Sequence, residues 1–428
     1  MVGIVEIIQF RILTVNRQRI LCQIVRSDAE EINFFRKLCT HHNCGRCLDH
    51  DTLLWISVLN ALLSERSFYF LHNRFDLANL AVGRFHGGLA YVNCLSSMFF
   101  GGISGSAVAD VSSLGSVVIP MMVKQGYTED FSVGLTVTTA CQGVLIPPSH
   151  NMVIYALAAG GVSIGTLFMA GLLPGIALGC GMIIMCMMMA KRYNFPKGEG
   201  VAKGEGVKIL LRGILPMMTL IIIMVGTGAG VFTATEASAI ACVYTMFLSM
   251  VVFRSVKLRD VGGILKNSLK TLAIVMTLLA TAKAFAYMMT ELRIPSAISS
   301  GLLSITDNKY ILLLIINVML LLLGCFMDMA PLITIMTPIL VPVVTNPAIG
   351  MDPVHFGVVL IFNLAVGLCT PPVGSALFVG CAIGKTPIER TARNMLPLYL
   401  TMVIVLMLVT YIPDISLLLP RLLMGYGA

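Results

Sequence analysis

Long apolar runs without a charged residue constrain the fold of this chain most. Residues 131–190 contain no Asp, Glu, Lys or Arg, while 213–253 contain only Glu236 and 310–351 contain only Asp328. Each run is long enough for about two membrane crossings or more, because a spanning helix needs about 20 apolar residues. The whole chain is 57% hydrophobic and only 12% charged, about half the charged fraction of a soluble domain. The sequence therefore predicts an all-α polytopic membrane protein.

Two apolar stretches are interrupted in the same way, once in each half of the chain. Residues 126–148 run from a glycine to a Pro-Pro pair, and residues 350–372 repeat this 224 positions later. Each follows a segment rich in Gly, Ser, Thr or Pro, at 99–120 and at 325–342. Since proline removes a backbone donor and interrupts a helix, these segments predict re-entrant hairpins and broken helices. Such repeated broken segments are typical of the binding region of a secondary transporter.

Composition divides the chain into four parts. We expect an atypical polar segment at 1–77, a first repeat at 78–196, a cytoplasmic linker with scaffold helices at 197–308, and a second repeat at 309–428. Much of the positive charge lies in two short loops, 191–212 and 254–270. Short basic loops beside spanning segments lie in the cytoplasm. The net charge of +8 is thus explained by topology, and nucleic-acid binding is not expected.

The polar segment at 1–77 carries a weak candidate for a metal site. Cys44 and Cys47 have the spacing of a zinc-ligand pair, and His50 is placed to add a third ligand. A second ligand pair at loop distance is missing from the sequence, so the alternative is that these residues form no site. A frameshifted or mis-started reading frame would also produce such a segment. A genuine small soluble domain is the other explanation, and a metal-binding head on a membrane-anchored assembly protein is the function it would suggest.

The first broken segment combines backbone freedom with oxygen-bearing side chains. Ser104 and Ser106 lie among glycines, and Asp110 is the only charged side chain between residues 85 and 123. Hydroxyls and carbonyls freed at a helix break form a cage of oxygen ligands suited to Na⁺. Positive helix ends nearby attract an anionic substrate. The alternative is that the small residues only allow helices to pack closely.

The second broken segment repeats the breaks with different side chains. Asp328 is its only charged residue, and Thr370 stands directly before Pro371 and Pro372. Two consecutive prolines leave carbonyls without their usual helical donors. One break in each half predicts two facing half-sites.

Two charged residues lie outside the repeated segments. Glu236 follows Thr233 and Thr235, which predicts the start of a helix. Lys283 lies in the middle of an apolar segment, where it would meet a carboxylate, snorkel to the membrane surface or face a water-filled cavity. A nucleophile–base pair is not evident in the membrane portion, so an enzyme is not expected.

The chain resembles the large membrane subunit of TRAP transporters, the DctM-type permease, over residues 78–428. The motifs that carry the resemblance are FGGISGSAVAD (100–110), PPSHNMVIYA (147–156), GLCTPPVGSALFV (367–379) and YIPDISLLLPRLL (411–423). The resemblance implies inverted repeats and an elevator-type transporter that crosses the lipid bilayer of the bacterial inner membrane several times. It implies import of an organic acid, such as a C4-dicarboxylate, sialic acid or a sugar acid, by Na⁺ symport. It also implies a small membrane subunit and a periplasmic substrate-binding protein as partners, and no cofactor.

The same resemblance implies positions for the ligands. One cation site would use Ser104, Ser106 and carbonyls near Gly143 and Pro147, and the other would use carbonyls near Gly324 and Gly367 with Thr370. The substrate would lie between the hairpin tips. The residues expected around it are Ser106, Asp110, Ser149, Asp328 and Pro372.

Overall fold

The computed structural model describes residues 75–427, except for short gaps at 76, 194, 197–205, 229, 295–296, 299–300, 302–307 and 348. All described residues belong to one unit of the chain, residues 51–428. They form helices and no strand, which confirms the predicted all-α fold. The candidate metal ligands Cys44, Cys47 and His50 lie outside the described residues.

The first half contains a hairpin followed by a broken helix. The hairpin joins α6 (Gly88–Ser104) to α7 (Ala107–Lys124) through a tip at Gly105 and Ser106. The broken helix and the long helix after it comprise α8 (Glu129–Ala140), α9 (Gln142–Leu145), α10 (His150–Ala159) and α11 (Ile164–Tyr193).

The middle of the chain forms a group of longer helices. These are α12 (Gly206–Gly228), α13 (Ala234–Phe247) with its π-helical extension η1 (Leu248–Val252), the short η2 (Leu258–Asp260) and α14 (Val261–Glu291). Thr233 and Glu236 form a capping box, which confirms the predicted start of α13. Lys283 on α14 donates to the Ala158 carbonyl at 3.3 Å, so this cation lies at the C-terminal end of α10, where the helix dipole favours it.

The second half repeats the order of the first. A hairpin of α16 (Lys309–Gly324) and α17 (Met329–Val344) precedes the broken helix of α18 (Pro353–Leu368) and α19 (Ser375–Gly384). The chain then ends with α20 (Ile388–Asn394), α21 (Leu396–Tyr411) and α22 (Pro413–Met424).

The two broken helices start with the same local structure. Gly126 and Gly350 both have positive φ, +98° and +63°, which glycine adopts without steric cost. Two residues later, Thr128 and Asp352 serve as N-caps whose side chains accept backbone N–H groups of the first turn. Sequence positions 224 apart therefore have the same structural role.

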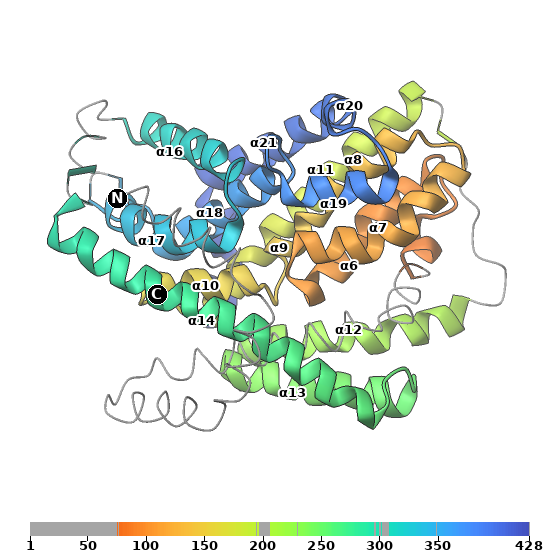
Figure 1. Cartoon of the computed structure of the whole chain (residues 1–428), viewed down its shortest axis with the longest axis horizontal. Coiled ribbons are helices and arrows are strands. Elements are labelled where there is room, and N and C mark those ends of the chain that lie inside the picture. Colours follow the sequence, from red (N-terminus) through yellow and green to blue (C-terminus); the bar gives the residue numbers. More distant parts are fainter. Residues whose placement is uncertain are drawn as a thin grey trace, which may run out of the picture. The chain divides into compact units, whose positions relative to one another are not determined.

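Each half contributes one helix that packs against the hairpin of the other half. In Figure 1, α10 from the first half packs on α17 of the second, and α19 from the second half packs on α7 of the first. Within each half the hairpin arm packs on the broken helix, α6 on α8 and α16 on α18. This reciprocal arrangement brings the two broken helices together near their breaks, where the sulfur atoms of Cys141 and Cys369 are 3.0 Å apart.

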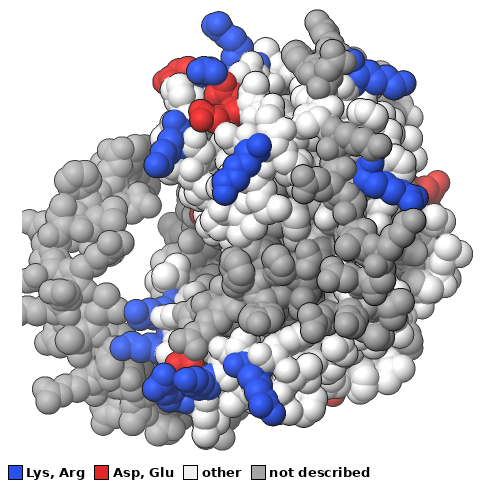
Figure 2. Space-filling view, turned by 90° about the vertical axis from the view of Figure 1, so that its right-hand side faces the viewer, with Lys and Arg blue, Asp and Glu red and all other residues white. Residues whose placement is uncertain are grey.

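The helices have the composition of membrane segments. Among the described residues, four helices are long and apolar enough to cross a membrane, or five if the bent pair α20 and α21 counts as one span. Apart from α7, which is one of these four, the hairpin arms and half-helices are shorter, as expected of segments that do not cross alone. On the face drawn in Figure 2, the Lys and Arg side chains lie toward its upper and lower parts. This distribution fits a membrane protein whose charged groups lie at the two membrane surfaces.

Candidate functional site

Each hairpin arm touches its broken helix through a pair of glycines. A Cβ on Gly101 would lie 1.9 Å from the Cα of Gly143, and a Cβ on Gly367 would lie 2.6 Å from the carbonyl carbon of Gly324. Only glycine allows two backbones to approach this closely. The structure therefore brings together Gly143 with the first hairpin, and Gly324 with Gly367.

Both breaks leave carbonyl oxygens without their ordinary helical donors. In an α-helix, the carbonyl of residue i accepts from the N–H of residue i+4. Pro147 and Pro148 stand four residues after Gly143 and Val144, and the pair Pro371–Pro372 stands in the same relation to Gly367 and Leu368. Since proline has no N–H, these carbonyls lack their i+4 donor, and the Gly367 carbonyl accepts from the Thr370 N–H at 3.0 Å instead. The peptide bonds Pro147–Pro148 and Pro371–Pro372 are both cis.

Hydroxyl-bearing residues lie at the first hairpin tip and at the second break. Ser106 is the N-cap of α7, and its Oγ accepts from the Ala109 N–H at 3.5 Å. The Thr370 hydroxyl donates to the Val366 carbonyl at 2.7 Å, which leaves the oxygen lone pairs directed away from that bond. Ser104 is the last residue of α6, at the hairpin tip.

The hairpin tips lie directly on the breaks. A Cβ on Gly105 would lie 2.8 Å from the Pro148 carbonyl oxygen and 3.0 Å from the His150 nitrogen. In the second half the Val373 N–H donates to the Cys325 carbonyl at 3.0 Å. In each half, therefore, the hairpin tip contacts the break of the broken helix. Ser106 lies at the tip of the first half, and Thr370 lies at the break of the second.

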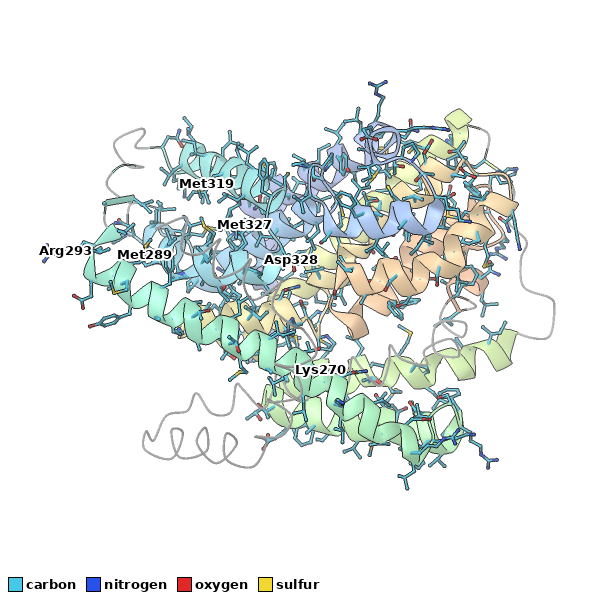
Figure 3. All side chains as sticks on the ribbon, in the orientation of Figure 1. Lys270, Met289, Arg293, Met319, Met327 and Asp328 are labelled. Carbon is cyan, nitrogen blue, oxygen red and sulfur yellow. The ribbon has the colours of Figure 1, made fainter. Side chains whose placement is uncertain are left out.

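The two predicted carboxylates occupy different positions. Asp110 is 1% exposed, and its Oδ2 lies 2.5 Å from the position of a Cβ on Gly143, so the carboxylate faces the first break. Asp328 is instead the exposed N-cap of α17, and Figure 3 labels it at that hairpin tip. Its structural counterpart is Ser106, the N-cap of α7, and not Asp110.

Helix N-termini meet at the centre of the site. Ser149 is the N-cap of α10 and is fully buried, and the Asn151 amide lies 3.7 Å from the sulfur of Met329 at the start of α17. The starts of α10 and α17 are therefore neighbours. Pro372 is exposed just before α19. Helix N-termini carry partial positive charge and unpaired N–H groups, which suit an anionic ligand.

A pair of buried thiols joins the two broken helices, and the sequence patterns did not predict this role. The Cys141 thiol donates to the Ala365 carbonyl at 3.0 Å, and the Cys369 thiol donates to the Val137 carbonyl at 3.3 Å. The two sulfur atoms are 3.0 Å apart. Each thiol donates to a carbonyl that lacks its usual helical donor. The Cys369 N–H, four residues after Ala365, donates to Val366, and the Cys141 N–H, four residues after Val137, donates to Thr138. Single cysteines in apolar segments gave no sign of this pairing, which spans 228 residues.

A third residue that the patterns missed is Tyr399 on α21. Its hydroxyl donates to the Cys369 carbonyl at 2.5 Å, directly after the Gly367–Leu368 pair. The described part of the chain holds no group of three or more His, Cys, Asp or Glu side chains arranged for a metal ion.

Comparison with known proteins identifies the family. Residues 67–415 match the family described as the tripartite ATP-independent periplasmic transporter, DctM component. The chain belongs to this family. It is 38% identical over 353 residues to the sialic acid TRAP transporter large permease protein SiaM of Vibrio cholerae, which covers 82% of each chain. It is 37% identical over 346 residues to the C4-dicarboxylate TRAP transporter large permease protein DctM of Pseudomonas aeruginosa, covering 81% of this chain and 80% of that one.

A solved structure supports the fold of this TRAP permease independently of sequence. The YdaH transporter of Alcanivorax borkumensis superposes with a TM-score of 0.64 over 90% of this chain and 88% of that chain. The sequence identity is only 13%, so the likeness concerns the fold. The predicted transporter fold with hairpins and broken helices is confirmed, and the chain is a multi-pass membrane protein.

Proposed function

We propose that this chain is the large permease subunit of a secondary transporter that imports an organic acid by Na⁺ symport. It would act in the bacterial inner membrane with a small membrane subunit and a periplasmic substrate-binding protein. The observation that carries the proposal is the reciprocal pair of breaks, each with carbonyls that proline deprives of their donors. No chemical bond of the substrate needs to change, so the protein acts as a carrier and not as an enzyme.

The oxygen atoms at the breaks suit Na⁺ as the coupling ion. Carbonyls of Gly143 and Val144 with the Ser106 hydroxyl would form one site, and carbonyls of Gly367 and Leu368 with the Thr370 hydroxyl would form the other. Neutral oxygen ligands of this kind coordinate Na⁺ at unwound helices in transporters. The Asp110 carboxylate beside Gly143 adds negative charge to the first site, which favours a cation there over an anionic substrate.

An organic acid suits the space between the tips because its carboxylate is an anion. The neighbouring N-termini of α10 and α17 offer partial positive charge and the buried Ser149 hydroxyl. Relatives named for sialic acid and C4-dicarboxylates carry substrates with this chemistry in common. Asp328 at the start of α17 would repel a second carboxylate, and we therefore expect it to limit the charge of the substrate accepted there.

The reciprocal packing suggests how transport proceeds. Helices α7 with α19 and α10 with α17 bind the two halves into one body that contains both breaks. We infer that this body moves against the α12–α14 helices in an elevator-type motion. The Lys283 bond to Ala158 crosses from α14 to α10 and would have to break in that motion.

Uptake into proteoliposomes tests the proposal. The chain would be reconstituted with its small subunit and binding protein, and uptake of sialic acid and of a C4-dicarboxylate would be measured with Na⁺ or with choline outside. We expect uptake of one organic acid that requires Na⁺ and falls at least tenfold on Ser106→Ala or Thr370→Ala, about 1.4 kcal/mol of lost cation binding.

Matched substitutions control for the loss of a hydroxyl alone. Thr345 at the end of α17 donates to the Val341 carbonyl at 2.8 Å, much as Thr370 donates to Val366. Ser112 in α7 donates to the Ala109 carbonyl at 2.9 Å. Thr345→Ala and Ser112→Ala should leave the Na⁺ dependence unchanged. Uptake that is equally fast in choline, or unchanged in both site variants, would reject the assignment.

A further inference from the structure

Tyr399 fixes the peptide unit at the centre of the second break. Its hydroxyl donates to the Cys369 carbonyl at 2.5 Å. The N–H of the same peptide unit belongs to Thr370 and donates to the Gly367 carbonyl at 3.0 Å. Because a peptide unit is planar, holding its oxygen at one end and its N–H at the other fixes the orientation of the whole plane.

The orientation of that peptide plane sets the positions of two groups expected to bind the cation. The Gly367 carbonyl accepts from it, and the Thr370 side chain begins at its next Cα. The Cys369 carbonyl has lost its usual donor, because the N–H of Val373 donates to Cys325 instead. Without the Tyr399 hydroxyl, the Cys369 oxygen would have to find another partner, and rotation of the plane would misplace Gly367 and Thr370 together.

The corresponding position of the first half carries no hydroxyl. The position that corresponds to Tyr399, 224 residues earlier, is Gly175 on α11. There α11 packs so closely that a Cβ on Gly175 would lie 2.6 Å from the Cγ1 of Ile146. The first break is therefore positioned by the close packing of Gly175 on Ile146. The corresponding peptide of the second break is positioned by one hydrogen bond from the Tyr399 hydroxyl.

We propose that Tyr399 is a positioning residue for the cation site of the second break. It acts through the Cys369–Thr370 peptide and does not itself bind the ion. The inference rests on the proposed Na⁺ coupling and assigns to α21 a role in tuning the Na⁺ affinity of one of the two sites.

The test is Na⁺-dependent thermal stabilisation of the purified full-length chain, with Tyr399→Phe beside the wild type. A ligand that binds only the folded state raises the free energy of unfolding by RT ln(1 + [L]/Kd), so fitting the unfolding temperature against the Na⁺ concentration gives the Na⁺ Kd without any substrate or partner. Loss of one hydrogen bond that positions the ligands should raise the fitted Na⁺ Kd about three- to tenfold.

Tyr155→Phe provides a matched control. The Tyr155 hydroxyl donates to the Pro353 carbonyl at 2.6 Å, at the far end of α18 from Gly367. Both variants lose a phenol bonded to a backbone carbonyl, and both should unfold at a lower temperature without Na⁺. Only Tyr399→Phe should shift the Na⁺ titration. An equal shift in both variants, or none in Tyr399→Phe, overturns the proposal.

A double substitution separates positioning from general destabilisation. Thr370→Val removes the hydroxyl ligand, and Tyr399→Phe should have less than half its separate effect on Na⁺ affinity in that background, because both act on one peptide. Fully additive effects would also overturn the role of Tyr399. If the wild type itself shows no stabilisation by Na⁺ over choline, the proposed Na⁺ coupling fails first, which distinguishes that outcome from a failure of Tyr399 alone.

Discussion

The two breaks share a backbone design but differ in how they are covered. Pro147, Pro148 and Ser149 are buried, and Ser149 has no exposed surface. The corresponding residues of the second half, Pro371 to Val373, are exposed, and Val373 is 45% exposed. At the first break, the tip glycine Gly105 packs closely against the chain at Pro148 to His150. At the second break, the Val373 N–H donates to the Cys325 carbonyl of the tip, and the Val373 side chain stays exposed.

This difference shows which features the two repeats share and which features differ between them. Glycine pairs, prolines and caps recur because each is needed to build a broken helix inside a bundle. The cover over the break depends on the residues at each tip, which have diverged: Ser106 at one N-cap and Asp328 at the other. We therefore expect ligands to exchange through the second break while the first remains closed.

The glycine pairs provide the largest test of the comparison. Gly101→Ala would place its Cβ 1.9 Å from the Gly143 backbone, while Gly324→Ala would place its Cβ 3.3 Å from Gly367. The first clash is with backbone that no rotamer relieves, so we expect about 4 kcal/mol or more of destabilisation and loss of folded protein. The second requires a shift of a few tenths of an ångström and should leave a folded protein. The measurement is the yield and unfolding temperature of detergent-purified protein.

Gly367→Ala serves as the reference for a severe clash in the second half, because its Cβ would lie 2.6 Å from Gly324. It should behave like Gly101→Ala. If Gly101→Ala and Gly324→Ala are equally well folded, the close crossing of α6 with α9 is wrong.

Much of this arrangement could be predicted from the sequence, because it follows from residue types with one strong local effect. Glycine runs, paired prolines and a lone Thr–Glu cap predicted the hairpins, the breaks and the start of α13. The contacts of Cys141, Cys369 and Tyr399 could not be predicted in this way. The cysteine contacts join segments more than 220 residues apart and the Tyr399 contact joins two different helices, and a cysteine or tyrosine in an apolar helix is equally compatible with simple packing. The structural mismatch between Asp110 and Asp328 was hidden because both are lone charges in their segments.

Cysteine labelling measures the difference in solvent exposure between the two breaks. Ser149→Cys and Val373→Cys would be treated with a membrane-impermeant maleimide, and modification of each peptide would be followed by mass spectrometry, so that native cysteines do not interfere. A thiol must be exposed to react. We expect Val373→Cys to react at least about 100-fold faster, because Ser149→Cys needs a local opening that costs a few kcal/mol.

Ser112→Cys on the exposed side of α7 gives the rate of an uncovered thiol. Equal rates at positions 149 and 373, or faster labelling at 149, would mean that the first break opens as readily as the second.

The thiols that link the two breaks provide a smaller test. Cys141→Ala leaves the Ala365 carbonyl without its 3.0 Å donor, and Cys369→Ala does the same for Val137. Each should cost about 1 kcal/mol more than Cys94→Ala, in line with one lost hydrogen bond. Cys94 is an apt control because it is equally buried and contacts a sulfur, Cys186, at 4.0 Å within the same half. Thermal unfolding of the four proteins checks this, and equal losses would show that the thiols only fill space.

The starts of the two broken helices give the smallest expected effect. Asp130, near the start of α8, pairs with Arg390 at 2.5 Å, whereas Asp352, at the start of α18, accepts from the Tyr426 hydroxyl at 3.1 Å. Burial, together with the negative charge of Asp352, raises the pKa of Tyr426 to about 12. The neutral phenol therefore stabilises the fold below pH 10, and this contribution is lost as the pH rises from about 10, where the unfolded tyrosine ionises, to about 12.

Tyr426→Phe should remove about 1 kcal/mol at neutral pH, the usual net contribution of one hydrogen bond, since solvent screens this partly exposed group. The variant should then lose less stability than the wild type between pH 9 and pH 11.5 when unfolding is followed by heating in detergent. Asp130→Asn tests the other half, where the ion pair with Arg390 responds to the salt concentration. Parallel pH curves for the wild type and Tyr426→Phe would mean that the two helix starts are held by the same kind of interaction, and the difference between the halves would then be confined to the breaks.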